Sequence, residues 1–490
     1  MTDALKANAS VSAENDPNLF PVEPVLDAES APAVGPTLSE RARKLPRLME
    51  IDRAVSFAIL TRLWAFIAGP VSALVIATRF TPALQGYYYT FGSILALQAF
   101  AELGIGVAIT QFASHEWSRL HVSEKGRIEG DADSLSRLAS LAQIAMKWYA
   151  VVALLVVCGL SIAGYVFFLK SPAHDVSWKT PWFFLCVFEG INLFTIAVWS
   201  LLEGCNQVSE VYLYRLGQSV LGSVVVWTAI IMGAGLWTAA IMAAVNVIYA
   251  GSFLRRNYWN FLKILLETKP RGPRVRWRSD ILPFQWRIAV SWMSGYLIFS
   301  LFIPVLFHYH GAVVAGQMGM TWSLVSVLSA VGAAWISPRV PQFGMLIAQK
   351  KYAELDRLFW RVTRVVSIVA ILGAAAILAL VYGLNHFHLK LAARLLPPLP
   401  TALFLGATVL YTSSGTMAAY LRAHKREPLL FVSVLLGVVV GLSTWQLGMR
   451  FGAVGMGAGY LACYTLIVPV IISVWKRSRR EWHGGEPTTI

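Results

Sequence analysis

Residues 255–286 read RRNYWNFLKILLETKPRGPRVRWRSDILPFQW, a basic, proline-containing stretch that divides the chain into two halves. Six long apolar runs precede this stretch and six follow it. They cover about 54–77, 87–113, 141–169, 181–203, 211–233 and 236–254, then about 287–308, 312–337, 363–384, 399–421, 428–448 and 452–475. A run of roughly 20 apolar residues is long enough to span a bilayer as a helix. The spacing therefore predicts an all-α integral membrane protein with about 12 transmembrane helices in two six-helix bundles around a central cavity.

The composition agrees with this fold class. The chain has 490 residues, of which 57% are hydrophobic and 14% are charged, and its mean hydropathy is +0.59. Soluble proteins carry about 25% charged residues, so a secreted disulfide scaffold, a soluble enzyme and a nucleic-acid binder are excluded despite a net charge of +15. The four cysteines lie in or beside apolar runs at no metal-ligand spacing, so we predict no metal site and no cofactor.

The charge pattern predicts the segments outside the bundles. Residues 1–46 combine low hydrophobicity with seven acidic residues and then a basic cluster, which indicates a disordered cytoplasmic tail. The predicted order is a tail at 1–46, a first bundle at 54–254, a basic cytoplasmic linker at 255–286, a second bundle at 287–475 and a cytoplasmic tail at 476–490.

Lysine and arginine set the orientation in the membrane. With the N-terminus inside, the flanks and loops on that side hold 32 of the 41 Lys and Arg residues, and the loops on the other side hold 6. Because short loops rich in Lys and Arg stay in the cytoplasm, both termini are predicted to be cytoplasmic. Two amphipathic stretches on that side, residues 257–267 and 345–361, are expected to lie against anionic lipid.

Charged residues within the apolar runs are candidates for function, because placing a charge inside a membrane is costly. Arg62, Glu102 and Arg215 come to similar depths when the runs are built with a rise of about 1.5 Å per residue. One interpretation is a structural Arg62–Glu102 ion pair between adjacent helices. The other is a cavity where Arg62 and Arg215 bind a diphosphate through bidentate hydrogen bonds and Glu102 binds a proton or cation.

Polar residues on one face of a helix also help to decide whether the first half has a hydrophilic cavity. In each of three apolar runs, two polar residues are three or four positions apart, so they lie on the same face of a helix. The pairs are Gln98 with Glu102, Glu189 with Asn192, and Arg215 with Gln218. They predict a hydrophilic interior with Glu102, Glu189, Gln98, Asn192 and Gln218 as ion-coupling or cavity residues. Interhelical hydrogen bonding is the alternative explanation.

The second half is poorer in charge. Its apolar runs contain no Asp or Glu, and its polar residues include the hydroxyl-rich stretch 412–416. Arg287 and Arg422 lie near predicted cytoplasmic helix ends, where we expect the guanidinium groups to reach towards the interface. No G-x-x-x-x-G-K-[ST] loop occurs, so ATP hydrolysis by this chain is not expected.

Several motifs resemble one family. The stretch Gln85-Gly86-Tyr87-Tyr88, followed by Glu102-Leu103-Gly104-Ile105-Gly106, resembles the first-lobe pattern of bacterial polysaccharide flippases. ISPRVPQFGMLIAQKKYAELDRLFWR at 336–361 is similar to the family's eighth-helix exit, and FGAVGMGA at 451–458 is similar to its glycine-rich entry to helix 12. These motifs together resemble the oligosaccharide flippase branch of the multidrug, oligosaccharidyl-lipid and polysaccharide exporter superfamily.

The resemblance implies a flippase of the cell inner membrane, and not an enzyme. It would move an undecaprenyl-diphosphate-linked oligosaccharide from the cytoplasmic to the periplasmic leaflet by alternating access, in the biosynthesis of a polysaccharide such as exopolysaccharide. The implied partners are this substrate, membrane lipids and polysaccharide assembly enzymes, with no nucleic acid. Two alternatives remain open: a cation-coupled multidrug efflux antiporter, and a membrane-bound glycan polymerase or ligase.

Overall fold

The computed structural model describes residues 38–102, 104–123, 128–170, 176–276, 282–424 and 426–483. Ile51–Ile490 forms one compact unit, distinct from Met1–Glu50. Residues 1–37 of the predicted N-terminal tail and residues 484–490 of the C-terminal tail lie outside the described residues. The first helix begins at Leu38 and the last ends at Trp482, so helices extend into both predicted tails.

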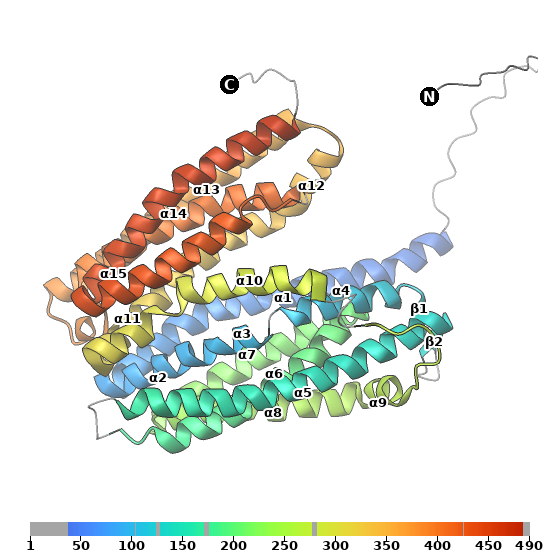
Figure 1. The fold of residues 1–490 in the computed structure, drawn as a ribbon, viewed down its shortest axis with the longest axis horizontal. Coiled ribbons are helices and arrows are strands. Elements are labelled where there is room, and N and C mark those ends of the chain that lie inside the picture. The colour runs from blue at the N-terminus through green and yellow to red at the C-terminus, as the bar shows by residue number, and fades with distance from the viewer. Residues whose placement is uncertain are drawn as a thin grey trace, which may run out of the picture. The chain divides into compact units, whose positions relative to one another are not determined.

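Helices make up nearly all of the described chain (Figure 1). In the first half they are α1 (Leu38–Arg79), α2 (Pro82–Leu95), η1 (Ala96–Gln98), α3 (Ala99–Glu102), α4 (Ile105–Trp117), α5 (Ala132–Leu169), α6 (Lys179–Gly204), α7 (Val208–Ile231), α8 (Trp237–Asn257) and α9 (Trp259–Glu267). In the second half they are α10 (Leu282–Phe299), α11 (Phe302–Ile336), η3 (Ser337–Arg339), α12 (Val340–Ala348), α13 (Tyr352–His386), η4 (Ala392–Arg394), α14 (Pro398–Ala423) and α15 (Leu430–Trp482).

A short hairpin, unforeseen from the sequence, follows α4. Its strands are β1 (Leu120–Val122) and β2 (Ile128–Gly130), paired antiparallel with Leu120 opposite Gly130. It leads into α5, where the carboxylate of Asp131 accepts a hydrogen bond from the backbone nitrogen of Ser134 at 2.9 Å. This side-chain cap satisfies one of the free N–H groups at the start of the helix.

Helix α11 contains a reversal of the chain. Gly311 has non-helical angles, φ 87° and ψ 173°, which a residue with a side chain rarely adopts. The ring of Phe302 lies 5.0 Å from the ring of Trp322. In a straight helix the same twenty-residue separation would correspond to about 30 Å. The chain therefore folds back at Gly311 into two antiparallel arms.

Helix α15 reverses in the same way at Gly452, which has φ 61° and ψ −145°. A Cβ placed on Gly459 would lie 2.1 Å from the hydroxyl of Ser443, and one placed on Gly455 would lie 2.7 Å from the carbonyl oxygen of Leu447. Residues on either side of Gly452 thus face one another at backbone distance. Gly455, in the FGAVGMGA motif, and Gly459, just after it, allow this close packing of the two arms.

The reversals reconcile the helix count with the sequence. By length and composition, nine helical segments among the described residues can cross a membrane, and the bent pair Pro82–Glu102 and Ile105–Trp117 makes a tenth. Two of these segments, Met293–Ala348 and Leu430–Trp482, contain the reversals at Gly311 and Gly452. When each arm is taken as one crossing, the twelve apolar runs correspond to twelve crossings. The predicted all-α membrane fold is confirmed.

The two halves of the chain meet where α2 packs on α11. A Cβ on Gly86 would lie 1.8 Å from the carbonyl oxygen of Ala312, and one on Gly316 would lie 2.8 Å from the backbone nitrogen of Gly86. Buried Gln85 donates from Nε2 to the carbonyl oxygens of Gly316, at 2.8 Å, and Arg394, at 3.1 Å. We call this contact the α2–α11 seam. Its closeness depends on glycine on both helices.

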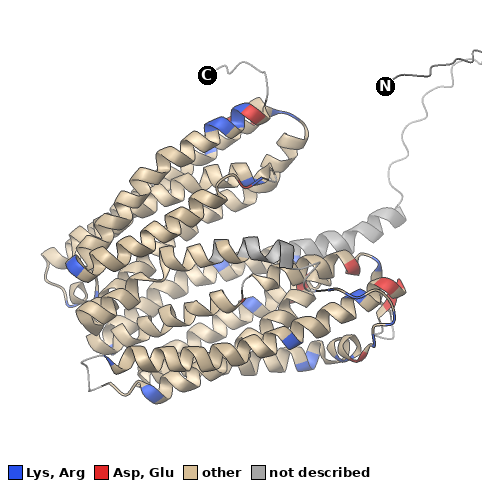
Figure 2. Ribbon diagram, viewed as in Figure 1, with Lys and Arg blue, Asp and Glu red and all other residues tan. Residues whose placement is uncertain are grey.

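Two further contacts join the halves. The guanidinium of Arg394, in η4, donates to the carbonyl oxygen of Phe80 at 2.6 Å, just after α1. The ring of Phe100, in α3, lies 5.1 Å from the ring of Tyr296 in α10. Along these helices charged residues are sparse, and Lys, Arg, Asp and Glu gather mainly near helix ends (Figure 2). The few charges away from the ends therefore stand out.

Candidate functional site

The second apolar run is broken at its acidic residue. Helix α3 ends at Glu102, and Gly104, with φ 67° in the left-handed region, precedes α4. The segment Pro82–Glu102 is inclined by 45° to α4. A break inside a membrane helix frees backbone groups that usually line a cavity or bind an ion. The glycine makes the left-handed step possible, and the break places Glu102 at the point of bending.

The surroundings of Glu102 are tightly packed. A Cβ on Gly106 would lie 2.9 Å from the hydroxyl of Ser200 in α6 and 3.4 Å from Oε1 of Glu102. Thr110 donates to the carbonyl oxygen of Ser200 at 3.1 Å, which joins α4 to α6. Glu102 is half-buried. A carboxylate so placed, beside hydroxyl groups and a helix break, can hold a proton or a small cation.

The predicted Arg62–Glu102 ion pair is not formed. Arg62 is exposed on α1 and makes no hydrogen bond or ion pair with the residues the structure describes. Helix α1 is held instead against α7, because Trp64 donates to the carbonyl oxygen of Ser219 at 3.2 Å and Trp227 donates to the hydroxyl of Ser72 at 2.9 Å. These contacts fix the rotation of α1, and they leave Arg62 exposed.

Arg215 pairs with Glu203, a pairing that was not predicted from the sequence. Its guanidinium forms an ion pair and a hydrogen bond with Glu203, so α7 is linked to α6. It also lies 5.3 Å from the ring centre of Tyr212. In this structure Arg215 is therefore paired with Glu203, and its role in binding a diphosphate stays a prediction.

The other predicted cavity residues are dispersed. Asn192 donates to the carbonyl oxygen of Ala243 at 3.3 Å, so it joins α6 to α8 as interhelical hydrogen bonding would. The buried Oε1 of Gln98 has no hydrogen-bond partner among the described residues. Glu189 and Gln218 are half-buried on α6 and α7. The roles of these residues as cavity or ion-coupling residues stay predictions.

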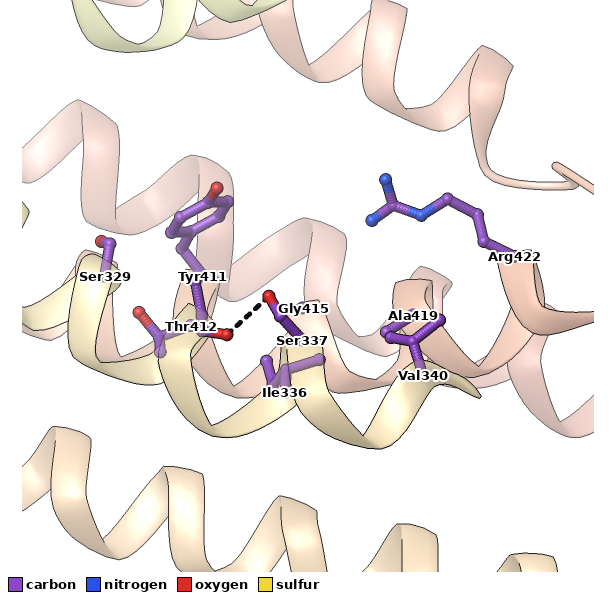
Figure 3. A pocket seen from close by; sticks show the side chains of 10 residues that line it. Ser329, Ile336, Ser337, Val340, Tyr411, Thr412, Gly415, Ala419 and Arg422 are labelled. Carbon is purple, nitrogen blue, oxygen red and sulfur yellow. Dashed lines mark hydrogen bonds between the residues drawn. The ribbon is translucent and has the colours of Figure 1, made fainter. Parts of the chain in front are cut away.

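The second half contains a cavity of about 390 Å³ between α11 and α14 (Figure 3). Tyr411, Gly415, Ala419 and Arg422 line it from one face of α14, because their spacing of three and four residues is helical. The other lining residues are Ser329, Ala333, Ile336, Ser337, Val340 and Thr412. Gly415 and Ala419 are small and therefore leave space for the cavity, and Tyr411 and Arg422 lie at its two ends along α14.

Arg422 lies in the last turn of α14 and is exposed. Figure 3 shows its guanidinium pointing back along α14 towards the Tyr411 end of the cavity, and not past the end of the helix. Its Nε donates to the carbonyl oxygen of Ala418 at 3.2 Å, and no acidic residue pairs with it in the described chain. The interfacial position expected for Arg422 stays a prediction.

The hydroxyl-rich stretch 412–416 divides between two roles. Thr416 accepts a hydrogen bond from Thr363 at 3.0 Å, and Ser413 accepts one from Ser367 at 3.0 Å, so both hold α14 against α13. Thr412 instead lines the cavity, and its buried hydroxyl has no partner among the described residues. A signal for the cavity was present in the sequence as Tyr411-x3-Gly415-x3-Ala419-x2-Arg422, but only the structure shows what faces it.

A polar cluster lies where α13 begins and where α14 and α15 end. Arg479 pairs with Asp356, which also accepts a hydrogen bond from the hydroxyl of Tyr420 at 3.1 Å. The Nε2 atoms of His424 and His483 are 3.1 Å apart. Burial lowers the pKa of His424, and burial lowers the pKa of His483 to about 4. Among the described residues, no group of three or more His, Cys, Asp or Glu could hold a metal ion.

The fold is shared with solved membrane transporters. No protein-family model matches the chain, and no curated protein matches its sequence. An inward-facing multidrug resistance MATE family transporter of the MOP superfamily aligns with a TM-score of 0.60 at 12% identity, over 89% of this chain and 100% of that chain. The lipid II flippase MurJ, in an inward closed conformation, aligns with a TM-score of 0.59 at 12% identity, over 87% of this chain and 90% of that chain.

A third solved structure has a lower similarity. A MOP superfamily transporter from Pyrococcus furiosus, described as having a reversed polarity of its binding pocket, aligns with a TM-score of 0.50 at 12% identity, over 89% of this chain and 96% of that chain. At these identities the likeness establishes the fold. It leaves the family and the substrate to be argued from the residues.

Proposed function

We propose that the protein is an alternating-access flippase that moves an undecaprenyl-diphosphate-linked oligosaccharide across the cell inner membrane in polysaccharide biosynthesis. The observation that carries the proposal is the presence, in each half of the chain, of a guanidinium group without an acidic partner. Arg62 and Arg422 have no acidic partner among the described residues, and the apolar runs of the second half contain no Asp or Glu. Unpaired guanidinium groups favour an anionic substrate, and phosphate suits their planar donors.

The seam supplies a plausible gate for alternating access. At the α2–α11 seam the two halves pack through Gly86 and Gly316 with almost no space between backbones. By the distribution of Lys and Arg, the opposite end of the helices faces the cytoplasm, so the seam closes the periplasmic side. Opening would require the α2–α11 contacts and the Arg394–Phe80 hydrogen bond to break together. Substrate would then enter from the cytoplasm and leave after the seam opens.

The titratable residue best placed to couple transport to an ion is Glu102. It lies at a helix break, as ion sites of broken-helix transporters do. Glu189 is a second candidate on α6. Proton or cation binding at either residue would change the local charge by one unit in the interior. The polysaccharide assembly enzymes remain proposed partners.

A deletion strain tests the proposal. We expect lipid-linked oligosaccharide to accumulate in the cytoplasmic leaflet and exported polysaccharide to fall, with drug susceptibility unchanged. Arg62→Ala should impair export in the complemented strain, and Arg62→Lys, which keeps the charge but loses the fork, should impair it less. Equal and unimpaired export by both variants would remove Arg62 from the substrate path.

A multidrug cation antiporter is the second candidate function. Two observations favour it: the likeness in fold to a MATE transporter, and the acids Glu102 and Glu189 in the first half. Normal polysaccharide with new drug sensitivity in the deletion strain would select it and make these acids the cation site. The fold likeness supports a transporter over the third possibility, a membrane-bound glycan polymerase or ligase.

A further inference from the structure

We infer that the cavity between α11 and α14 binds the phosphate-bearing head of the lipid-linked substrate, with Arg422 as its anion-binding residue. This inference rests on the proposed function. It places the head-group site in the second half of the chain, where the sequence predicted no anion-binding residue.

The cavity is a consequence of residue size along one face of α14. Gly415 and Ala419 occupy the two middle positions between Tyr411 and Arg422. A Cβ placed on Gly415 would meet its nearest neighbour, the side chain of Ile336, at 4.0 Å, so the space is genuinely open there. Binding cavities for small ligands usually measure about 300–1,000 Å³. A volume of about 390 Å³ can therefore hold a phosphate group together with part of an attached sugar or lipid.

The charge in the cavity has one sign. Arg422 uses Nε in a hydrogen bond to Ala418, which leaves its terminal nitrogens available in the described chain. Guanidinium groups within membrane proteins almost always have a counter-charge or face water. Because the side chain turns towards the cavity (Figure 3), a bound anion would supply that counter-charge. The planar terminal nitrogens can bind two oxygens of one phosphate.

A hydroxyl group completes the donor set. Tyr411 contributes a phenol at the far end, and its ring is fixed by Phe299 at 5.3 Å and by Tyr464 at 5.8 Å. Thr412 lines the same space, but its hydroxyl oxygen is buried. The hydroxyl donor that the cavity offers is therefore the phenol of Tyr411, and a bound oxyanion would accept its hydrogen bond.

The test is a binding measurement on the full-length protein in neutral phosphatidylcholine nanodiscs. The probe is farnesyl diphosphate, with farnesol, inorganic diphosphate and phosphatidylglycerol as comparison ligands. Arg422→Ala should lower the affinity for farnesyl diphosphate about 10- to 100-fold, since a charge-assisted hydrogen bond pair is lost. Arg422→Lys should lie between the wild type and Arg422→Ala.

The matched control is Arg364→Ala. Arg364 lies on α13, is exposed, and has the same kind of backbone contact, from Nε to the carbonyl oxygen of Trp360 at 3.3 Å. It does not line the cavity. Its loss removes one positive charge without touching the site, so affinity should stay within about twofold of the wild type. Tyr411→Phe keeps the ring packing and folds in any case, and it should weaken binding about 3- to 10-fold.

The comparison ligands separate the sources of the phosphate. Binding of inorganic diphosphate that depends on Arg422 supports a site that reads the diphosphate itself. Displacement of the probe by phosphatidylglycerol at equal concentration, or equal binding of farnesol, overturns the inference, because the site would then accept any lipid. Wild-type affinity in both Arg422→Ala and Tyr411→Phe overturns it as well, while leaving the proposed function standing.

Failure of the proposed function gives a different result. In that case the wild-type protein would not bind farnesyl diphosphate and would bind the lipophilic cation tetraphenylphosphonium instead, with a dependence on Glu102 or Glu189. That result overturns the inference together with the function on which it rests.

Discussion

The two halves of the molecule treat polar residues differently. In the first half the interior charges are both acidic and basic, one arginine is paired with a glutamate, and an acid lies at a helix break. In the second half the described crossings are joined by hydroxyl groups, and Arg422 faces a cavity with no acid opposite. The same architecture thus offers a carboxylate that can exchange an ion and a cation that can hold an anion.

This difference suggests a division of labour. Coupling to an ion gradient needs a group that changes charge at physiological pH, while holding a phosphate needs a group that stays charged. A carboxylate in a membrane can do the first and a guanidinium the second. The seam between the halves would then link the two events mechanically.

The largest effect is expected at the seam itself. Gly86→Ala brings a Cβ to within 1.8 Å of the carbonyl oxygen of Ala312, so α2 and α11 must move apart. Overpacking of about 1–3 kcal/mol would reduce the population with a closed seam about 5- to 150-fold. Cysteine cross-linking across the seam and a transport assay measure the change. Gly92→Ala is the control on the same helix, because a Cβ there has no neighbour within 4 Å.

Glu102→Gln tests the role given to the first half. If this carboxylate carries one elementary charge per transport cycle, the membrane potential contributes about 2.3 kcal/mol of driving free energy per 100 mV. Loss of this charge should therefore reduce gradient-driven accumulation of the substrate about 50-fold at 100 mV. Substrate binding at the second half should persist. Glu116→Gln is the control: Glu116 is buried 2.9 Å from Arg137, so its variant should lower thermal stability and leave coupling unchanged. Full gradient dependence in Glu102→Gln would place the ion site elsewhere.

The ion pairs of the two halves sharpen the contrast on a smaller scale. Double-mutant cycles on Asp356 and Arg479 should give an interaction free energy of about 1.5–3 kcal/mol. The reason is that the Asp356 carboxylate also binds Tyr420 and that both side chains are 24% or less exposed. The Glu203–Arg215 pair, with Arg215 45% exposed, should give about 0.2–1 kcal/mol. Unfolding monitored in detergent measures both. The opposite ranking would mean that Arg215 is structurally more important than its exposure indicates.

A separate effect, on stability and not on transport, concerns the end of α15. The pKa of His483 is about 4 in the folded protein, against 6.5 when unperturbed, because of burial. The unfolded state therefore binds more protons between pH 4 and 6.5, so stability falls as the pH is lowered through this window and is fully retained above it. Limited proteolysis of the C-terminal end at pH 7 and pH 5 should show faster cleavage at pH 5. His483→Gln should remove most of that difference, and an unchanged pH dependence would assign it to another group.

Local sequence predicted most of the helices but not the details of the second one. A run such as 141–169 is helical because no polar break interrupts it, and α5 covers it entirely. The run 87–113 was equally apolar, yet it begins earlier, at Pro82, and breaks after Glu102. The signal was Gly104, whose left-handed angle ends one helix and starts another. Glycine permits this angle without requiring it, so the residue alone could not predict the break.

Candidate site residues were predicted less well than helices. Depth along a helix follows from counting residues, and this is why Arg62 and Glu102 were matched at one level. The rotation of each helix about its axis depends on packing. For α1, the contact of Trp64 with α7 sets this rotation. The pairing of Arg215 with Glu203 on the adjacent helix also depends on rotation, which counting residues does not give.

The sequence by itself determined that this chain is an all-α membrane protein with about twelve crossings divided by residues 255–286, because the length and periodicity of apolar runs are local properties. The tertiary structure decided which charges are paired, where α2 meets α11 and that Arg422 faces a cavity. These depend on helix rotation and on close approach between residues far apart in the chain. Both are set by the fit of many side chains at once, which no single stretch of sequence contains.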